Sequence, residues 1–171
     1  NTPINCCNTA RVANMQKMFY KATNFNQPLD WDVASVNNMD SMFRKASNFN
    51  QPIDDWNVAS LLTTRAMFRD ASNFNQSLND WDVSSVTAMN AMFWAVSNFN
   101  QPLDDWNTAS VTDMGYMFFY ASNFNQCLSS WAAKTPPNVD IRIIFSVSGC
   151  PNTSDPDPSV GPWCQGDNEQ C

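Results

Sequence analysis

The chain has 171 residues, of which 43% are hydrophobic, and a formal net charge of −7 at pH 7. This composition suits one domain with a buried core, and the acidic balance argues against a nucleic-acid partner, because phosphate binding needs Lys and Arg patches. No apolar run reaches the length of about 18 residues that a membrane span requires, so we expect none. The chain has no His, which removes Ser-His and Cys-His nucleophiles, so we expect neither an enzyme nor a cofactor.

A short block, Phe-Asn-Gln followed mostly by Pro, recurs along the chain at steps of 24 or 25 residues. Each copy is followed by Leu or Ile, then by Asp or Asn in most copies, and then by Trp. The blocks begin at Phe25, Phe49, Phe74, Phe99 and Phe124, and the Trp residues are Trp31, Trp56, Trp81, Trp106 and Trp131. A fixed period over five copies indicates a repeat architecture in which neighbouring copies share one core.

Each repeat divides into two halves with different apolar spacing. In the last full copy, apolar residues fall at intervals of three and four, a spacing typical of one face of a helix: Val111, Met114, Met117, Phe118 and Ala121. After the Pro, Trp and Val lie two residues apart, as on one face of a strand. The sequence therefore predicts an α/β repeat solenoid with one short helix and one short strand per repeat, the strands forming a parallel array.

The ends of the chain depart from the repeat. We expect residues 1–11 to form an N-terminal Cys-containing cap, residues 12–131 to form five repeats, and residues 151–171 to form a Pro-rich, Cys-containing tail. Residues 132–150 are interpreted as a degenerate sixth repeat and C-terminal cap, because Ile141, Ile144 and Phe145 align with the apolar residues of the preceding copy. A β-strand is the alternative for this Ile-rich segment.

The six cysteines lie at or near the two ends of the chain. They are Cys6, Cys7, Cys127, Cys150, Cys164 and Cys171. Without His and without a CxxC pair, this pattern favours disulfides that staple the ends, in an oxidising and therefore extracellular compartment. Fifteen full pairings are possible, although the adjacent Cys6 and Cys7 are expected to have separate partners. Asn152, in the triplet Asn152-Thr153-Ser154, is a candidate glycosylation site.

The Asn of each Phe-Asn-Gln block is never replaced. These residues are Asn26, Asn50, Asn75, Asn100 and Asn125. An inward Asn can bridge backbone groups of adjacent coils, so we interpret the set as a structural ladder. A ligand-binding ladder on the surface is the alternative.

Acidic residues form a column directly before Trp. The column contains Asp30, Asp55, Asp80 and Asp105, and a second column of Asp and Asn follows the same Trp residues. Stacked carboxylates about 5 Å apart could recruit calcium, which accepts oxygen ligands in flexible geometry. The competing interpretation is a solvated acidic face that keeps the protein soluble.

The repeat pattern MFxxASNFNQPLDDWxVxSVxxM resembles the BspA-like repeat of mycoplasma surface lipoproteins and of secreted microalgal and protist proteins. The resemblance covers residues 12–131, and the C-terminal segment is similar in style to microalgal members. It implies a leucine-rich-repeat-like solenoid at the cell surface or outside the cell, with adhesion as a proposed role. The chain departs from the pattern at Thr64, Ser77 and Cys127, and the resemblance transfers no functional residue.

Two functional hypotheses follow. Residues 1–75 hold seven Lys and Arg against six Asp, whereas residues 76–171 hold two against ten acids. A solenoid has two open ends, so a basic head could stack on an acidic tail in a head-to-tail filament or surface layer. The alternative is a monomeric adhesion module for glycans or proteins, which would use partly exposed aromatic residues. These are Tyr20, Trp94, Phe119 and Tyr120, for which packing between adjacent repeats is the competing interpretation.

Overall fold

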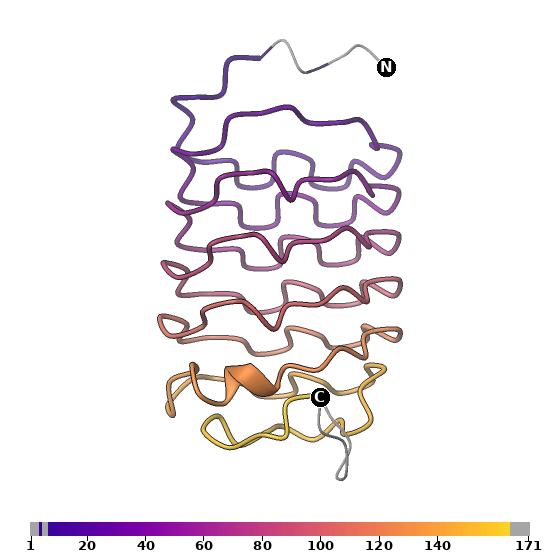
Figure 1. The fold of residues 1–171 in the computed structure, drawn as a ribbon. Coiled ribbons are helices and arrows are strands. Elements are labelled where there is room, and N and C mark those ends of the chain that lie inside the picture. The colour runs from indigo at the N-terminus through magenta and orange to yellow at the C-terminus, as the bar shows by residue number, and fades with distance from the viewer. Residues whose placement is uncertain (1–3, 5–6, 165–171) are drawn as a thin grey trace.

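The computed structural model describes residue 4 and residues 7–164. These residues wind into a stack of coils, with the first coil at one end and the last at the other (Figure 1). Isolated parallel β-bridges connect each coil to the next at one position per coil: Asn14, Asn38, Thr63, Ala88, Asp113 and Asp140. The spacing of these bridges follows the sequence repeat, so one repeat makes one coil.

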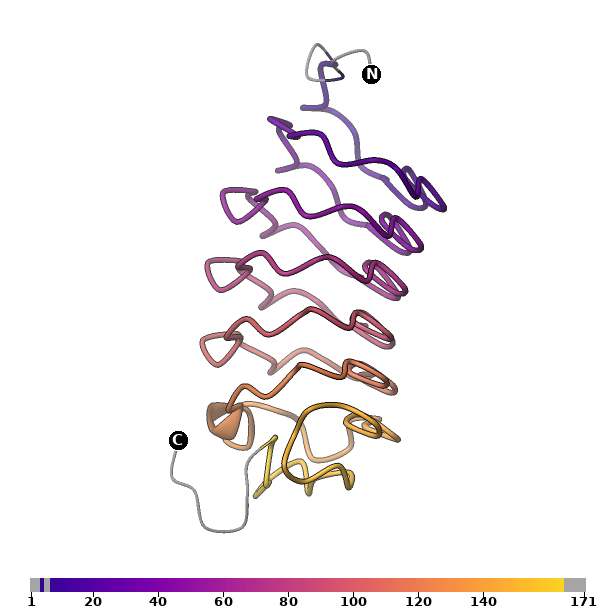
Figure 2. The ribbon, with the colours of Figure 1, turned by 90° about the vertical axis from the view of Figure 1, so that its right-hand side faces the viewer.

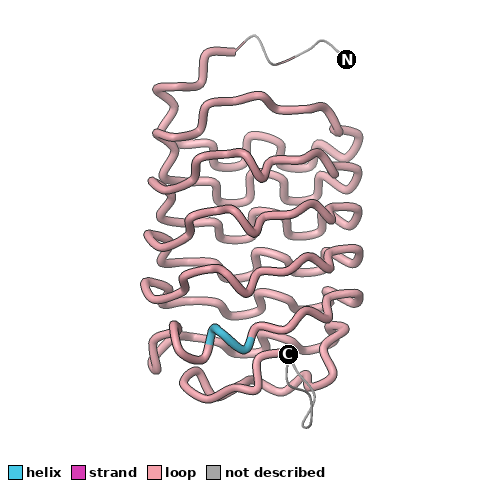
Figure 3. Tube along the Cα trace, in the orientation of Figure 1, coloured by secondary structure: helices cyan, strands magenta, loops and turns pink. Residues whose placement is uncertain are grey.

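The predicted alternation of a helix and a strand in every repeat is wrong. In the described part of the chain, the only helix is the 3-10 helix η1 (Ser129–Trp131), and no segment is long enough to be a strand (Figure 3). The parallel strand array is therefore not seen, and the stack is built from turns. The alternative β-strand for the segment around Ile141 is not seen either.

Each predicted helical segment is instead a succession of tight turns. In the first coil, Met18 N–H donates to the Met15 carbonyl and Ala22 N–H donates to the Phe19 carbonyl, as in three-residue turns. Lys17 and Lys21 have φ values of 59° and 62°. Left-handed residues four apart bring the intervening apolar residues inward at the same intervals of three and four that a helical face would show.

The hydrogen bonds that a helix would make internally are made between coils. The N–H groups of Met15, Lys17, Phe19 and Lys21 donate to four carbonyls of the second coil, at 2.8–2.9 Å. The rings of Phe19 and Phe43 in adjacent coils stack with centroids 5.3 Å apart. A helix is about 10 Å wide, which is twice the distance between these coils, so helices could not fit one above another on this wall.

Two walls enclose the core. The bridge wall consists of residues 14–22 and the equivalent residues 38–46, 63–71, 88–96, 113–121 and 140–148. The tryptophan wall consists of residues 26–34, 50–59, 75–84, 100–109 and 125–132. Side chains from both walls fill the space between them, and Phe43, Phe68, Phe93 and Phe118 from the bridge wall are fully buried. The side view shows the coils one above another, with tight loops at both edges (Figure 2).

Indole and amide ladders join the coils of the tryptophan wall. Trp81 Nε1 donates to the Ile53 carbonyl of the preceding coil at 2.9 Å. The same bond recurs from Trp56, Trp106 and Trp131 to the preceding Leu carbonyl, at 2.9–3.2 Å. Backbone pairing is therefore largely replaced on this wall by side-chain hydrogen bonds, which explains why no strand forms after the Pro.

Candidate functional site

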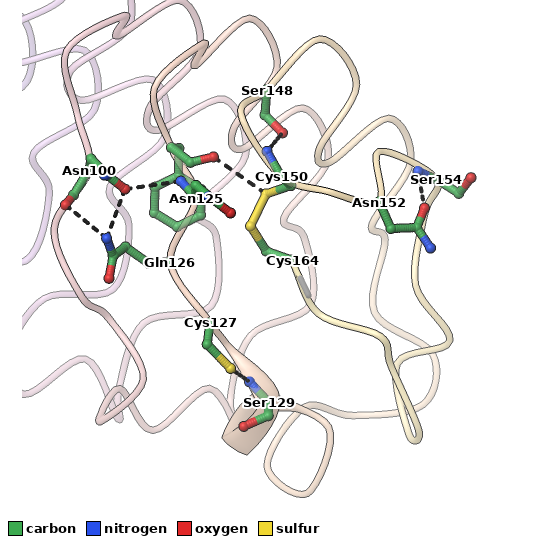
Figure 4. The surroundings of a disulfide bond; sticks show 11 residues. Asn100, Asn125, Gln126, Cys127, Ser129, Ser148, Cys150, Asn152, Ser154 and Cys164 are labelled. Atoms are coloured by element: carbon green, nitrogen blue, oxygen red, sulfur yellow. Dashed lines mark hydrogen bonds between the residues drawn. A yellow bond between two sulfur atoms is a disulfide. The ribbon is translucent and has the colours of Figure 1, made fainter. Parts of the chain in front are cut away.

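The invariant Asn residues form a ladder along the tryptophan wall. Asn75 Oδ1 accepts a hydrogen bond from Asn100 N–H at 2.9 Å and another from Gln101 Nε2 at 3.0 Å. The pattern repeats at Asn26 and Asn50, and at Asn100 toward Asn125 and Gln126 (Figure 4). Each of these four Asn residues thus ties its coil to the following one, and the Gln of the next block is the second donor.

The acidic columns lie on the outer face of the tryptophan wall. Asp30, Asp55, Asp80 and Asp105 are all exposed. Asp105 accepts a hydrogen bond from the amide of Asn79 at 2.7 Å, and Asp104 accepts one from Ser130 N–H at 3.1 Å. Among the described residues, no group of three or more Asp, Glu, Cys or His side chains could hold a metal ion. Calcium binding by these columns stays a prediction.

Cysteines at the C-terminal end form a staple. Cys150 and Cys164 are joined by a disulfide with their Cα atoms 4.9 Å apart (Figure 4). This bond holds residues 150–164 against the last coil, where buried Trp163 packs on Trp131 and Phe145. Cys127 is also disulfide-bonded.

Cys7 departs from the prediction of a disulfide, because it has a free and exposed thiol. Its N–H donates to the Ile4 carbonyl near the first coil, whereas the staple closes the segment that follows the last coil, at the opposite end of the stack (Figure 1). Cys6 and Cys171 lie outside the described residues. Asn152 is partly exposed in the loop that the Cys150–Cys164 disulfide closes, and its side chain accepts a hydrogen bond from Ser154 N–H at 3.0 Å.

The two ends of the stack are closed on one wall and open on the other. At the first coil, the Ile4 carbonyl accepts the Trp31 indole N–H, so the N-terminal segment covers the tryptophan wall. At the last coil, the Trp163 carbonyl accepts Leu128 N–H on the same wall. The described residues of the two terminal segments do not continue the ladder on the bridge wall. Two open ends were expected from the sequence, but not that they would be open on this wall.

The first coil presents a row of carbonyl groups at the open edge. Its side chains are less covered than their equivalents, since Met18 is 47% exposed and Met42 is fully buried. Beside this row, residues 21–25 line a depression of about 370 Å³. Within the described part of the chain, no hydrogen-bond donor reaches the carbonyl oxygens of Asn14, Gln16, Met18 and Tyr20.

The last coil presents the complementary row of N–H groups. Ile143 is 38% exposed and Val147 is 51% exposed at this edge. The tail meets the edge at Ile144, whose N–H donates to the Asp155 carboxylate at 3.0 Å. In the described residues, no acceptor is bonded to the N–H groups of Ile141, Ile143, Phe145 and Val147.

A family model matches residues 1–94 and residues 76–148, which together cover most of the chain. The chain belongs to the family described as "Mycoplasma protein of unknown function, DUF285". This assignment agrees with the BspA-like surface repeat at the level of the family. Searches among curated proteins and among solved structures gave no match. No helix in the described residues is long and apolar enough to cross a membrane.

Proposed function

We propose that this chain is an extracellular structural protein that assembles head to tail into a filament or surface layer, and that it is not an enzyme. One observation carries the proposal: the carbonyl row of the first coil is complementary to the N–H row of the last coil, and neither row has a hydrogen-bond partner among the described residues. The surface-repeat family and the disulfide support a location outside the cell, in the style of the secreted microalgal members.

The register of the joint follows from the register between coils. Within the stack, Tyr120 N–H donates to the Ser146 carbonyl at 3.1 Å, and the same bond joins Lys21 to Arg44 at 2.8 Å. Continuing this rule across two copies, Val147 N–H of one copy donates to the Tyr20 carbonyl of the next. The joint thus repeats the contact that already holds one coil to another, as in β-augmentation.

Apolar burial and charge add to the hydrogen bonds. The joint would cover Met18 at one edge and Ile143 and Val147 at the other, all of which are exposed in a single copy. The first 75 residues are nearly balanced in charge and the remainder is strongly acidic, so attraction between unlike ends favours the head-to-tail order over head-to-head contact. Because the contact is heterologous, it need not close on itself and can extend into a filament.

A charge-swap experiment tests this joint. Val147 of one copy is expected to lie beside Lys21 of the next copy, while the two residues lie at opposite ends of the same copy (Figure 1). Val147→Lys should therefore weaken assembly, and the double variant Val147→Lys, Lys21→Glu should restore it. Light scattering across a concentration series measures assembly, and electron microscopy shows its form.

The matched control is Val160→Lys, which places the same charge on a residue that is 78% exposed in the tail and away from the ladder. It should leave assembly unchanged. A monomer at all concentrations under native oxidising conditions would overturn the proposal. So would equal behaviour of the single and double charge variants, because the joint would then lie elsewhere.

A further inference from the structure

The charged residues are divided between the two walls of the stack. In its first three coils, the bridge wall carries six cations and two carboxylates. The cations are Lys17, Lys21, Arg44, Lys45, Arg65 and Arg69, and the carboxylates are Asp40 and Asp70. The outer face of the tryptophan wall carries exposed carboxylates instead. The bridge wall therefore has a cationic strip on a protein that is acidic as a whole.

Two arginines lie at the centre of this strip, at equivalent positions of neighbouring coils. The guanidinium carbon of Arg69 lies 3.7 Å from the centre of the Trp94 ring, and that of Arg44 lies 5.8 Å from the centre of the Tyr20 ring. The order along the stack is Tyr20, Arg44, Arg69, Trp94, so the two cations lie between two aromatic rings. Stacking of this kind fixes the plane of each guanidinium.

The positive charge of this arginine pair is only partly balanced. Arg69 Nε lies 3.7 Å from the Asp70 carboxylate, whereas Arg44 has no ion pair within the described residues. The Nε atoms of both arginines are buried without a hydrogen-bond partner. Burial, and next the charge of Arg44, lower the pKa of Arg69. An anion placed beside the two guanidiniums would offset the repulsion between their charges.

Aromatic rings continue the strip toward the C-terminal end. Trp94 stacks on Tyr116 with centroids 5.3 Å apart and meets Phe119 edge to face at 5.0 Å. Tyr120 is 51% exposed and packs edge to face against Phe119 at 4.4 Å. Such rings offer flat apolar faces with a polar edge, which suit the apolar faces of sugar rings.

We propose that the bridge wall binds a linear acidic polysaccharide, with a carboxylate or sulfate group held between Arg44 and Arg69 and an adjoining sugar packed against the exposed ring of Tyr120. An extended chain fits because the site runs in single file along the stack and stays clear of the acidic tryptophan wall. This site lies on the side of the stack and does not depend on head-to-tail assembly.

The experiment measures binding of polygalacturonate and of dextran sulfate to the purified chain, with neutral dextran as the reference. The chain should bind one or both anionic polymers and not dextran, and the preferred polymer identifies carboxylate or sulfate as the group recognised. Binding should weaken as salt is raised, because exposed charges are screened. The double variant Arg44→Gln, Arg69→Gln should bind about ten-fold more weakly.

Two further variants separate a defined site from general charge attraction. Lys17→Gln with Arg65→Gln removes two charges from the same strip but from residues without aromatic contacts, and it should retain most of the binding. Arg44→Lys with Arg69→Lys keeps the charge but loses the planar fork, and it should bind nearly as weakly as the Gln variant. Thermal melting confirms that each variant is folded.

Several results would overturn the proposal. Equal losses of binding in the two Gln variants would show that the polymer is attracted by the overall charge of the strip and not by the arginine pair. Binding of dextran as tight as that of the anionic polymers would remove the role of the arginines. A short single-stranded DNA that binds more tightly than both polymers would point to another class of ligand. Salt-sensitive association between copies without polymer binding would assign the strip to lateral contacts.

Discussion

The indole of Trp81 is hydrogen-bonded to the carbonyl of Ile53 in the preceding coil, at 2.9 Å and in a buried environment. This side-chain contact takes the place of a backbone hydrogen bond, because the tryptophan wall has no backbone ladder between coils. Trp81→Phe would keep the aromatic ring but leave the Ile53 carbonyl without a partner. We expect the free energy of unfolding to fall by about 1–3 kcal/mol, measured by urea denaturation.

Trp31→Phe is the matched control for this substitution. Trp31 donates to Ile4 at the end of the stack, at 3.3 Å and in a partly buried position. Its loss should cost less, because water can reach the freed carbonyl. Equal costs at both positions would show that indole hydrogen bonding does not stabilise the interior coils.

Substitutions in the Asn ladder should cost more stability at an interior position than at the last position. Asn75 accepts two hydrogen bonds from the following coil, while in the described residues the side-chain oxygen of Asn125 accepts none. Asn75→Ala should therefore lower the free energy of unfolding by about 1–3 kcal/mol, and Asn125→Ala by less than about 1 kcal/mol. Denaturant melts of both variants check this, and similar losses would contradict a purely structural ladder.

Several residues other than glycine have a left-handed backbone conformation, so replacing some of them with glycine should stabilise the chain. Ala95 has a φ of 56°, which costs an L-residue about 1–2 kcal/mol, more than glycine loses in chain entropy. Ala95→Gly should raise the free energy of unfolding by about 0.5 kcal/mol. Exposed Ala109, whose φ is not positive, is the control, and Ala109→Gly should destabilise by a similar amount. A loss of stability in both variants would contradict the assignment of strain to Ala95.

The hydrogen bonds of Asp82 should make a small part of the folding stability depend on pH. Its carboxylate is hydrogen-bonded to the Ser84 side chain and, at 3.0 Å, to Ser84 N–H, and these bonds lower its pKa. A lowered pKa in the folded state means that the contribution to stability is present above the unfolded pKa of about 3.9 and is lost as the pH falls through the folded value.

NMR titration of the Asp82 side chain measures this pKa directly. Ser84→Ala removes the side-chain hydrogen bond, which is the larger cause of the lowered pKa, and should move the pKa of Asp82 upward, toward its ordinary value. The neighbouring Asp80 serves as an internal reference in the same spectra. An unchanged Asp82 titration in the variant would show that the hydroxyl does not hold the carboxylate.

Which residues are buried could be predicted from the sequence, but the backbone that buries them could not. The repeated Met, Phe and Trp residues identified the core columns, because burial follows directly from apolar character and period. The helix was wrong because turns repeated every four residues give the same intervals as a helical face. Lys, Ser, Ala, Asp, Tyr, Ile and Val occupy the left-handed positions of the bridge wall, so no repeated Gly indicates the turns.

The candidate sites, too, could be predicted only in part from the sequence. The unvarying Asn marked a structural position, but only coordinates reveal that Gln101 and its equivalents share each Asn acceptor. The sequence suggested two open ends, while the wall that stays open depends on where the terminal segments lie. One sequence pattern accompanies the arginine pair, the repetition of Met-Phe-Arg at residues 42–44 and 67–69, but this pattern alone does not indicate a binding site.

The bonding of each coil mainly to its neighbours has a mechanical consequence. A chain pulled by its ends should unravel one coil at a time, because no contact spans the whole stack. Each step would release about 25 residues, or roughly 80–90 Å of extended chain. The Cys150–Cys164 bond closes the C-terminal end, whereas the first coil is only half covered, so unravelling should begin at the N-terminal coil. If the chain assembles into the proposed filament, each subunit would absorb tension in small increments rather than fail at once.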